Sequence, residues 1–261
     1  MRIVAFAGPS VPAEARAAFP RVEWRGPAEA GDFLHLPTSG PLTICLIDGY
    51  FDHRPAVRHK EILLLLSEGR RVVGGASIGA LRAVEMEPFG MEGAGSIYRA
   101  YARGLIDGDD EVALAHGPEE WEWRPLSVPL VEVRATLCRA VRMGAIAPAD
   151  ARCVREAAGE IHYVERTWEA VSLSLPPRLV ESARPALAGI HVPLKTLDAV
   201  ACLRAATTPP PRRRRPKPVS TIFLHALMDQ CGIDPATRPR ARSRGASASS
   251  PAGTPTGTDC D

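Results

Sequence analysis

The chain has 261 residues, of which 45% are hydrophobic, enough for one large core or for a core with an appendage. Its 32 basic and 30 acidic residues nearly balance, so the composition predicts no general attraction to nucleic acid. The 6 cysteines contain no C-x-x-C pair, which argues against a zinc knuckle, and we expect neither a metal nor a cofactor. No apolar run approaches the ~20 residues of a membrane span, and the first one is too short for a signal peptide. The sequence therefore predicts a cytoplasmic protein without a membrane partner.

The first half of the chain alternates the patterns of strands and helices. Ile3–Ala7 is an apolar run that predicts a strand, and Pro12–Phe19 follows as a short helical segment before a weaker strand near Val22–Arg25. Leu42–Ile47 is largely apolar, as expected of a strand that is covered on both faces. This alternation predicts an α/β fold with a partly parallel sheet.

A βαβ unit lies at the centre of this half. After the strand Leu42–Ile47, a helix over Val57–Glu68 and a strand over Arg71–Gly75 predict two parallel strands with a right-handed crossover. In such a unit, the carboxyl ends of both strands and the N-termini of the following helices lie at one edge of the sheet. The start of the helix over Val57–Glu68 and the residues that follow the strand Arg71–Gly75 are therefore expected at the same edge.

A G-x-S-x-G turn joins the second of these strands to the next helix, and it consists of Gly75, Ala76, Ser77, Ile78 and Gly79. Such a nucleophile elbow bends sharply because its glycines lack a Cβ atom, and it presents the serine hydroxyl beside a helix N-terminus. The unpaired amides at that terminus could stabilise an oxyanion. Two other interpretations stay open: a phosphate-binding turn, although the downstream lysine of a Walker sequence is missing, or a turn that only lets the helix pack tightly.

Lys60, early in the predicted helix Val57–Glu68, belongs to the same edge as Ser77. Beside the apolar run Ile62–Leu65 its amine would lose hydration, which favours the neutral form that can act as a base. Serine–lysine pairs are an established form of nucleophile activation. The alternative is a solvated lysine that pairs with Glu61.

Other polar residues are candidates for a supporting role. Arg82 and Glu85 are near neighbours on the helix after the turn, and they form an ordinary ion pair in the simpler interpretation. Asp109 and Asp110 belong to an acidic segment of a kind that can bind Mg²⁺. We favour capping of a helix that starts at Glu111, because the spacing lacks the regular alternation of a calcium loop.

The second half of the chain differs in composition. Leu130–Gly144 carries helical periodicity, and residues 136–206 are expected to form a helical appendage after a core domain at residues 1–135. Residues 207–261 begin with a basic, proline-rich run and are expected to be mostly disordered, apart from a short helix over Thr221–Cys231.

Several segments, in this order, resemble the TfuA-like proteins that accompany YcaO enzymes in making peptide thioamides. They are Leu46–Phe51, Val57–Leu63, Gly75–Ala83 and Gly95–Tyr98 continuing to Gly108–Ala113, with a weaker echo at Lys195–Ala199. The resemblance covers about residues 1–135. The sequence departs from the family at Ile78, where a smaller residue or methionine is expected, and at Arg58, where a bulky aromatic residue is expected.

The resemblance implies a partner protein rather than a free-standing metabolic enzyme. It implies a hydrolase with Ser77 as the nucleophile and Lys60 as the base, and we count Asp48 and His59 with the supporting candidates. The implied substrate is a thiocarboxylated sulfur-carrier protein similar to ThiS, which delivers sulfide to the ATP-dependent YcaO enzyme, so that contact with the precursor peptide is indirect. The alternative is a non-catalytic adaptor that strengthens the binding of the peptide to YcaO, with the Ser77 turn serving only the backbone.

Overall fold

A parallel sheet forms the centre of the molecule. The computed structural model describes residues 2–50, 54–177, 179–180, 189–210, 216–217 and 220–237. Its five-stranded sheet has the order β2-β1-β3-β4-β5, and all its paired strands are parallel. The strands are β1 (Arg2–Phe6), β2 (Val22–Arg25), β3 (Leu42–Leu46), β4 (Arg71–Gly74) and β5 (Glu92–Gly93). The predicted α/β class is confirmed, and the described sheet is parallel throughout rather than in part.

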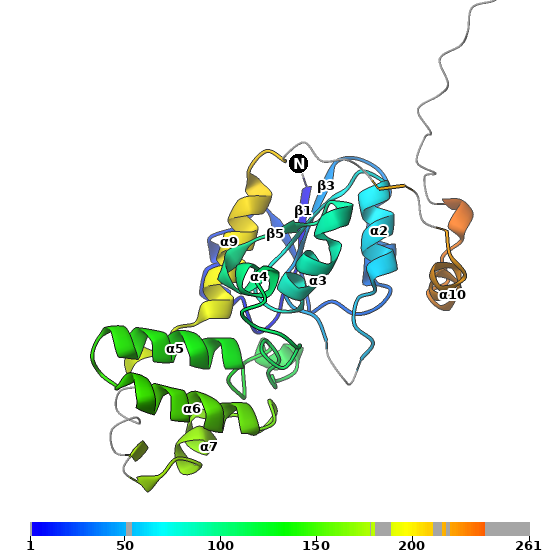
Figure 1. The fold of residues 1–261 in the computed structure, drawn as a ribbon. Coiled ribbons are helices and arrows are strands. Elements are labelled where there is room, and N and C mark those ends of the chain that lie inside the picture. Colours follow the sequence, from blue (N-terminus) through cyan, green and yellow to red (C-terminus); the bar gives the residue numbers. More distant parts are fainter. Residues whose placement is uncertain are drawn as a thin grey trace, which may run out of the picture.

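Helices cover both faces of this sheet (Figure 1). The helices α2 (His59–Ser67) and α3 (Ile78–Met86) share an apolar core with one face. The helices α1 (Ala13–Ala17) and α9 (Leu194–Thr207) share a second core with the other face. Successive residues of β3 alternate between the two cores, so β3 is buried at every position. This double burial explains the apolar run that the sequence shows there.

The βαβ unit predicted from the sequence is confirmed, with β3 and β4 parallel on either side of α2 in the chain. The helix begins at His59 rather than at Val57. The carboxylate of Glu61 accepts hydrogen bonds from the amides of Arg58 at 3.0 Å and Gly31 at 2.8 Å, and thereby fixes the first turn. The N-terminus of α2 is thus fixed against the loop that carries Gly31.

Of the helices after β5, the first belongs to the sheet domain and the next three form a unit of their own. The helix α4 (Gly95–Ala102) packs against α3 and α9 of the sheet domain. The next three helices, α5 (Leu130–Arg142), α6 (Pro148–Glu160) and α7 (Trp168–Leu173), share an apolar core of their own. We call α5–α7 the helical lobe; it is drawn in green beside the sheet domain in Figure 1.

The helix α9 differs from the predicted organisation, in which residues 136–206 formed one appendage. Its residues Ala199, Cys202, Leu203 and Ala206 are fully buried against the sheet. The guanidinium group of Arg71 donates to the carbonyls at the end of α9, which ties that end to β4. The chain therefore leaves the sheet domain, builds the helical lobe and returns to cover the sheet.

The helix α10 (Ile222–Gln230) lies in the segment predicted to be mostly disordered. Thr221 caps it by accepting a hydrogen bond from the Leu224 amide at 3.2 Å. Its Leu227 and Met228 join a small apolar cluster with Leu34 and Leu64 of the sheet domain. The predicted short helix is confirmed, and it packs on the core. Residues 238–261, the rest of the predicted tail, lie outside the described residues.

Short 3₁₀ turns complete the described elements. They are η1 (Asp32–His35), η2 (Glu87–Phe89), η3 (Glu119–Trp121) and η4 (Pro235–Thr237). Among the described helices, none combines the length and the apolar character needed to cross a membrane.

Candidate functional site

The carboxyl edge of the sheet gathers the polar residues of the candidate site. The chain runs from β1 outward to β2 and then back to β3, which lies on the other side of β1. The order of the strands therefore reverses between β1 and β3, and parallel α/β proteins bind ligands at such a point, beyond the carboxyl ends of the strands. The loop Gly8–Ser10 follows β1 there, Asp48 follows β3, and Ser77 follows β4.

The turn around Ser77 is tight because helix α3 approaches the sheet closely. A Cβ atom on Gly79 would lie 1.8 Å from the Leu46 carbonyl oxygen, and one on Gly74 would lie 2.1 Å from the Gly79 carbonyl oxygen. Ala76 has φ 66°, an uncommon value for a residue with a side chain, and the Ser77 amide donates to the Gly75 carbonyl at 2.9 Å. The backbone strain of this turn therefore lies at Ala76, next to the serine.

Ser77 occupies the N-cap position of α3, yet its side chain makes no capping hydrogen bond. Serine is favoured at this position because its hydroxyl usually accepts such a bond. Among the described residues, none forms a hydrogen bond with the Ser77 hydroxyl, and none accepts one from the Ile78 amide. Both groups stand at the positive end of a helix and are available to a ligand.

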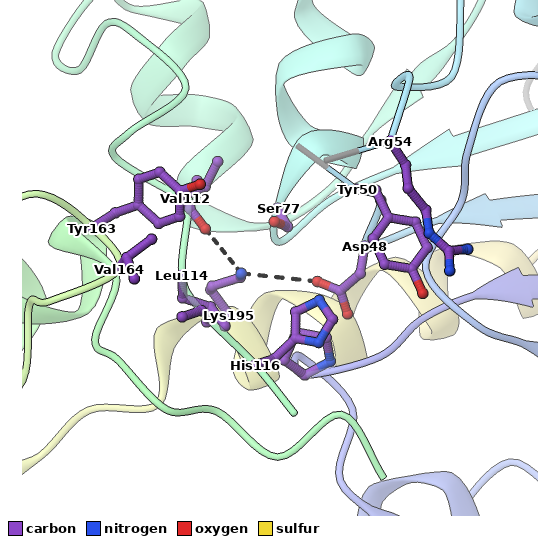
Figure 2. A pocket seen from close by; sticks show the side chains of 13 residues that line it. Asp48, Tyr50, Arg54, Ser77, Val112, Leu114, His116, Tyr163, Val164 and Lys195 are labelled. Carbon is purple, nitrogen blue, oxygen red and sulfur yellow. Dashed lines mark hydrogen bonds and ion pairs between the residues drawn. The ribbon is translucent and has the colours of Figure 1, made fainter. Parts of the chain in front are cut away.

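Lys195 is the lysine that shares a cavity with Ser77. It lies in the first turn of α9 and is 3% exposed. Its Nζ atom donates to the Val112 carbonyl at 2.9 Å and lies 3.8 Å from Oδ1 of Asp48 (Figure 2). Burial lowers the pKa of the Lys195 amine, and the Asp48 and Glu132 carboxylates partly oppose that effect. The fraction of neutral amine is therefore larger for Lys195 than for a solvated lysine at the same pH.

Asp48 is fixed by the loop that follows β1. Its carboxylate accepts hydrogen bonds from the amides of Gly8 at 2.8 Å and Ser10 at 3.0 Å and from the Ser10 hydroxyl at 2.6 Å. These donors hold the carboxylate at the strand edge and satisfy most of its acceptor capacity. Asp48 is therefore a rigid negative charge on one side of Lys195.

The cavity of Ser77 and Lys195 has a volume of about 230 Å³ and lies where the sheet domain meets the helical lobe. Tyr50, Arg54 and His116 line it together with Tyr163. Figure 2 shows the Ser77 and Lys195 side chains both directed into this space. A second cavity of about 460 Å³ includes Lys195, Pro9 and Leu114 in its wall as well, so the two adjoin at the lysine.

Lys60 does not line the cavity of Ser77, so the structure does not bring the two residues of the predicted pair together there. Sequence geometry assigns Lys60 to the carboxyl edge of the sheet, where α2 does begin. The side chain that enters the cavity instead comes from α9, which packs on the opposite face of the sheet from α2. Topology alone could not choose between the two, because a helix on either face can present its first turn at this edge.

The remaining supporting candidates lie outside this cavity. His59 and Arg82 both contact Glu85, with distances of 2.8 Å from His59 Nε2 and 2.7 Å from Arg82 Nη1 to Glu85 Oε2. This network links the start of α2 to the exposed side of α3, as the interpretation of an ordinary ion pair predicts for Arg82 and Glu85.

The acidic segment near Asp109 is a turn, so the expected helix at Glu111 is absent. The Asp109 carbonyl accepts hydrogen bonds from the amides of Val112 and Ala113, and the Glu111 carboxylate binds the Arg134 guanidinium of the helical lobe at 2.9 Å. The described part of the chain holds no group of three or more side chains suited to a metal ion. The acidic residues instead connect the loop over the cavity to the helical lobe.

Sequence reasoning missed the role of Lys195 and of His116, Tyr50 and Tyr163 in the cavity. Lys195 lies in the first turn of a helix that follows Pro193, and it belongs to the weak echo Lys195–Ala199, a signal that could have placed it. Lys60, Lys195 and Lys217 are the lysines of the chain, so the choice was narrow. Tyr50, His116 and Tyr163 come from loops, and sequence periodicity does not predict the course of a loop.

Fold and site together define a parallel α/β protein with a serine turn and a buried lysine at the carboxyl edge of the sheet. Residues 48–167 match the sequence profile of a family described as TfuA-like protein. The resemblance predicted from the sequence is thus confirmed over these residues, which are similar to TfuA-like proteins. No curated protein matches the chain.

Proposed function

We propose that this protein is a hydrolase-like accessory protein of YcaO-dependent peptide thioamidation, which hydrolyses a thiocarboxylated, ThiS-like carrier protein and thereby supplies sulfide. The observation that carries the proposal is a serine hydroxyl without a hydrogen-bond partner among the described residues, in one cavity with a buried lysine amine. Similarity to the TfuA-like family supports the accessory role. Ser77 is the proposed nucleophile, and Lys195 replaces Lys60 as the proposed base.

The reaction begins with attack of the Ser77 oxygen on the thiocarboxylate carbon at the C-terminus of the carrier. Neutral Lys195 accepts the hydroxyl proton, and the tetrahedral intermediate collapses with loss of sulfide, which takes that proton. Water then attacks the carrier ester of Ser77, with Lys195 again as the base; the ester C–O bond breaks, the Ser77 oxygen takes the proton from Lys195, and the carrier leaves as a carboxylate. One water is consumed, and one carboxylate and one hydrogen sulfide are formed. In the free protein the Ser77–Lys195 hydrogen bond need not be closed, since such bonds tighten in the substrate complex.

Two features of the site fit this chemistry. The Ile78 amide at the N-terminus of α3 is free to donate to the oxyanion, because it has no acceptor among the described residues. The cavity adjoins a second one at Lys195, which gives room for the extended C-terminal end of a carrier. The alternative of a turn that serves only the backbone does not account for either feature.

The catalytic pair is tested with Ser77→Ala and Lys195→Met, with Lys60→Met as the matched control. Hydrogen sulfide released from a thiocarboxylated carrier protein is measured under single-turnover conditions. We expect each of the first two variants to lose activity by about a hundredfold or more, because nucleophile and base act as one unit. Lys60→Met should stay within about twofold of the unaltered protein. Loss of activity in Lys60→Met with full activity in Lys195→Met would reverse our assignment of the base.

The adaptor hypothesis is separated from hydrolysis by the source of sulfur. Ser77→Ala changes one hydroxyl in a cavity, whereas a stable protein interface buries about 800 Å² per partner, so binding to a YcaO enzyme should persist. We expect this variant to fail in thioamidation when sulfur arrives on the carrier and to succeed when free sulfide is supplied. Unimpaired thioamidation from the carrier would favour the adaptor.

A further inference from the structure

The helix that carries Lys195 is held at its first turn by α5 of the helical lobe. Oε1 of Glu132 accepts a hydrogen bond from the Lys195 amide at 3.1 Å, and Oγ1 of Thr136 accepts one from the Val192 amide at 3.0 Å. Glu132 and Thr136 are four positions apart on α5 and therefore lie on the same face of that helix. A single helix face thus binds the backbone on both sides of Pro193.

Glu132 replaces a missing local cap. The N-cap residue of α9 is Pro193, which offers no side chain for capping. The Glu132 carboxylate, whose side chain is 12% exposed, supplies an acceptor and a negative charge at this positive helix end. His191 also faces it, with Nε2 at 3.5 Å from Oε2. A glutamate of the lobe is therefore part of the structure that fixes the position of Lys195.

The charged groups around the Lys195 amine come from two parts of the molecule. Asp48 lies 3.8 Å from it at the end of β3, the Glu132 carboxylate of α5 is near enough to favour its charged form, and the Val112 carbonyl accepts its hydrogen bond. His191 faces Glu132 from the far side. Burial raises the pKa of Glu132, and the hydrogen bond from the Lys195 amide and the lysine charge oppose that rise. The two groups therefore influence each other's charge.

We propose that Glu132 is a positioning residue for Lys195: it anchors the first turn of α9 through the Lys195 amide and places a negative charge opposite the lysine ammonium. This inference rests on the proposed function only where it calls Lys195 the base. By this inference the helical lobe has a function: it holds Lys195 in the cavity into which Ser77 projects from the sheet domain.

The decisive variant is Glu132→Gln, which keeps a carbonyl acceptor for the Lys195 amide and removes the charge. Loss of a nearby negative charge disfavours the ammonium form, so the rise of the hydrolysis rate with pH should move to lower pH by about half a unit to one unit. Thr136→Val is the matched control: it removes the neighbouring anchor without a change of charge and should leave that midpoint in place. Glu132→Ala, which lacks both acceptor and charge, should also lower the maximal rate, by about tenfold or more.

A measurement without turnover keeps the inference independent of the hydrolase assignment. The side-chain amine of Lys195 is titrated by NMR in the full chain and assigned by its loss in Lys195→Met, which is simple among Lys60, Lys195 and Lys217. The Lys195 midpoint should move to lower pH in Glu132→Gln and stay in Thr136→Val. An unchanged Lys195 midpoint in folded Glu132→Gln would overturn the proposal. A shifted midpoint in a protein that releases no sulfide would retain Glu132 as a positioning residue and reject the proposed function.

Discussion

The Lys195 amine is the residue on which the proposed chemistry depends, and its buried setting determines how the protein should respond to pH. Burial lowers its pKa from the ordinary value of about 10.4, and the active form is the neutral amine. The rate should therefore rise with pH through a midpoint below that value. Rates of sulfide release between neutral and alkaline pH measure it.

The matched variant for this pH dependence is Lys195→Arg. A guanidinium keeps its proton throughout this range, so the variant should show no rising limb and little activity. A profile of the unaltered protein that falls with pH would contradict a lysine base.

At this scale the sequence predicted one partner of the proposed pair and missed the other. The Ser77 turn was recognisable because a strand, five residues with two glycines and a helix follow one another directly in the chain. Lys195 lies 118 positions after Ser77 in the sequence. It belongs to a helix that packs on the sheet, and no local sequence pattern predicts that packing. The sequence favours Lys60 because the βαβ unit is a local feature, and periodicity predicts local features.

Among the elements, α3 depends most on small residues. Gly79 lies against the Leu46 carbonyl, so the added methyl group of Gly79→Ala must push α3 away from the strand end. We expect Gly79→Ala to lower the free energy of unfolding by about 2 kcal/mol or more. Denaturant titration followed by circular dichroism gives this value.

The control for that substitution is Gly159→Ala in α6, where a Cβ atom would meet nothing within 4 Å. Alanine is the better helix former, so this variant should gain about 0.5–1 kcal/mol. Equal effects of the two substitutions would show that the close approach of α3 to β3 does not affect the free energy of unfolding.

The helix α4 gives a second prediction, because it takes its N-terminal cap from α9. Oδ2 of Asp198 accepts a hydrogen bond from the Ile97 amide at 2.6 Å, and Asp198 is buried. Asp198→Ala should leave that amide unpaired and lower the free energy of unfolding by about 1–2 kcal/mol. Hydrogen exchange should then show faster opening of the first turn of α4, and unchanged exchange there would count against the cap.

Sequence periodicity predicts the positions of several strands and helices correctly. The strands β1 and β3 and the helices α2 and α5 lie where apolar spacing predicts them, since each buries one face or both. The helix expected at Glu111 does not form, because that carboxylate binds Arg134 of the lobe instead of staying with its own backbone. A tertiary contact of this kind leaves no mark on local spacing.

At the scale of the whole molecule, α10 tests how far the folded unit extends. Its Leu224, Leu227 and Met228 are buried in the cluster with Leu34 and Leu64. Each such side chain contributes up to about 1.5–3 kcal/mol, offset by the entropy of ordering the helix. A chain that ends at Pro210 should therefore melt several degrees lower and still hydrolyse substrate, since α10 does not line the cavity.

A chain that ends at Thr237 is the control for this truncation. It retains α10 and its contacts, so its melting temperature should match that of the full chain within about one degree. Identical melting of the Pro210 chain and the full chain would mean that α10 adds no stability.

The order of the elements along the chain bears on which fragments of this protein can fold alone. Residues 48–167, the region with the family signature, begin after β3 and end before α9. Such a fragment would hold the serine turn, β4, β5 and most of the lobe, but it would lack β1, β2 and β3 and the helix α9 that covers the second face of the sheet. We therefore expect that residues 48–167 do not fold as an independent unit. Because α9 follows the lobe in the chain, Ser77 and Lys195 cannot meet, and α9 cannot cover the second face of the sheet, until that helix has been synthesised.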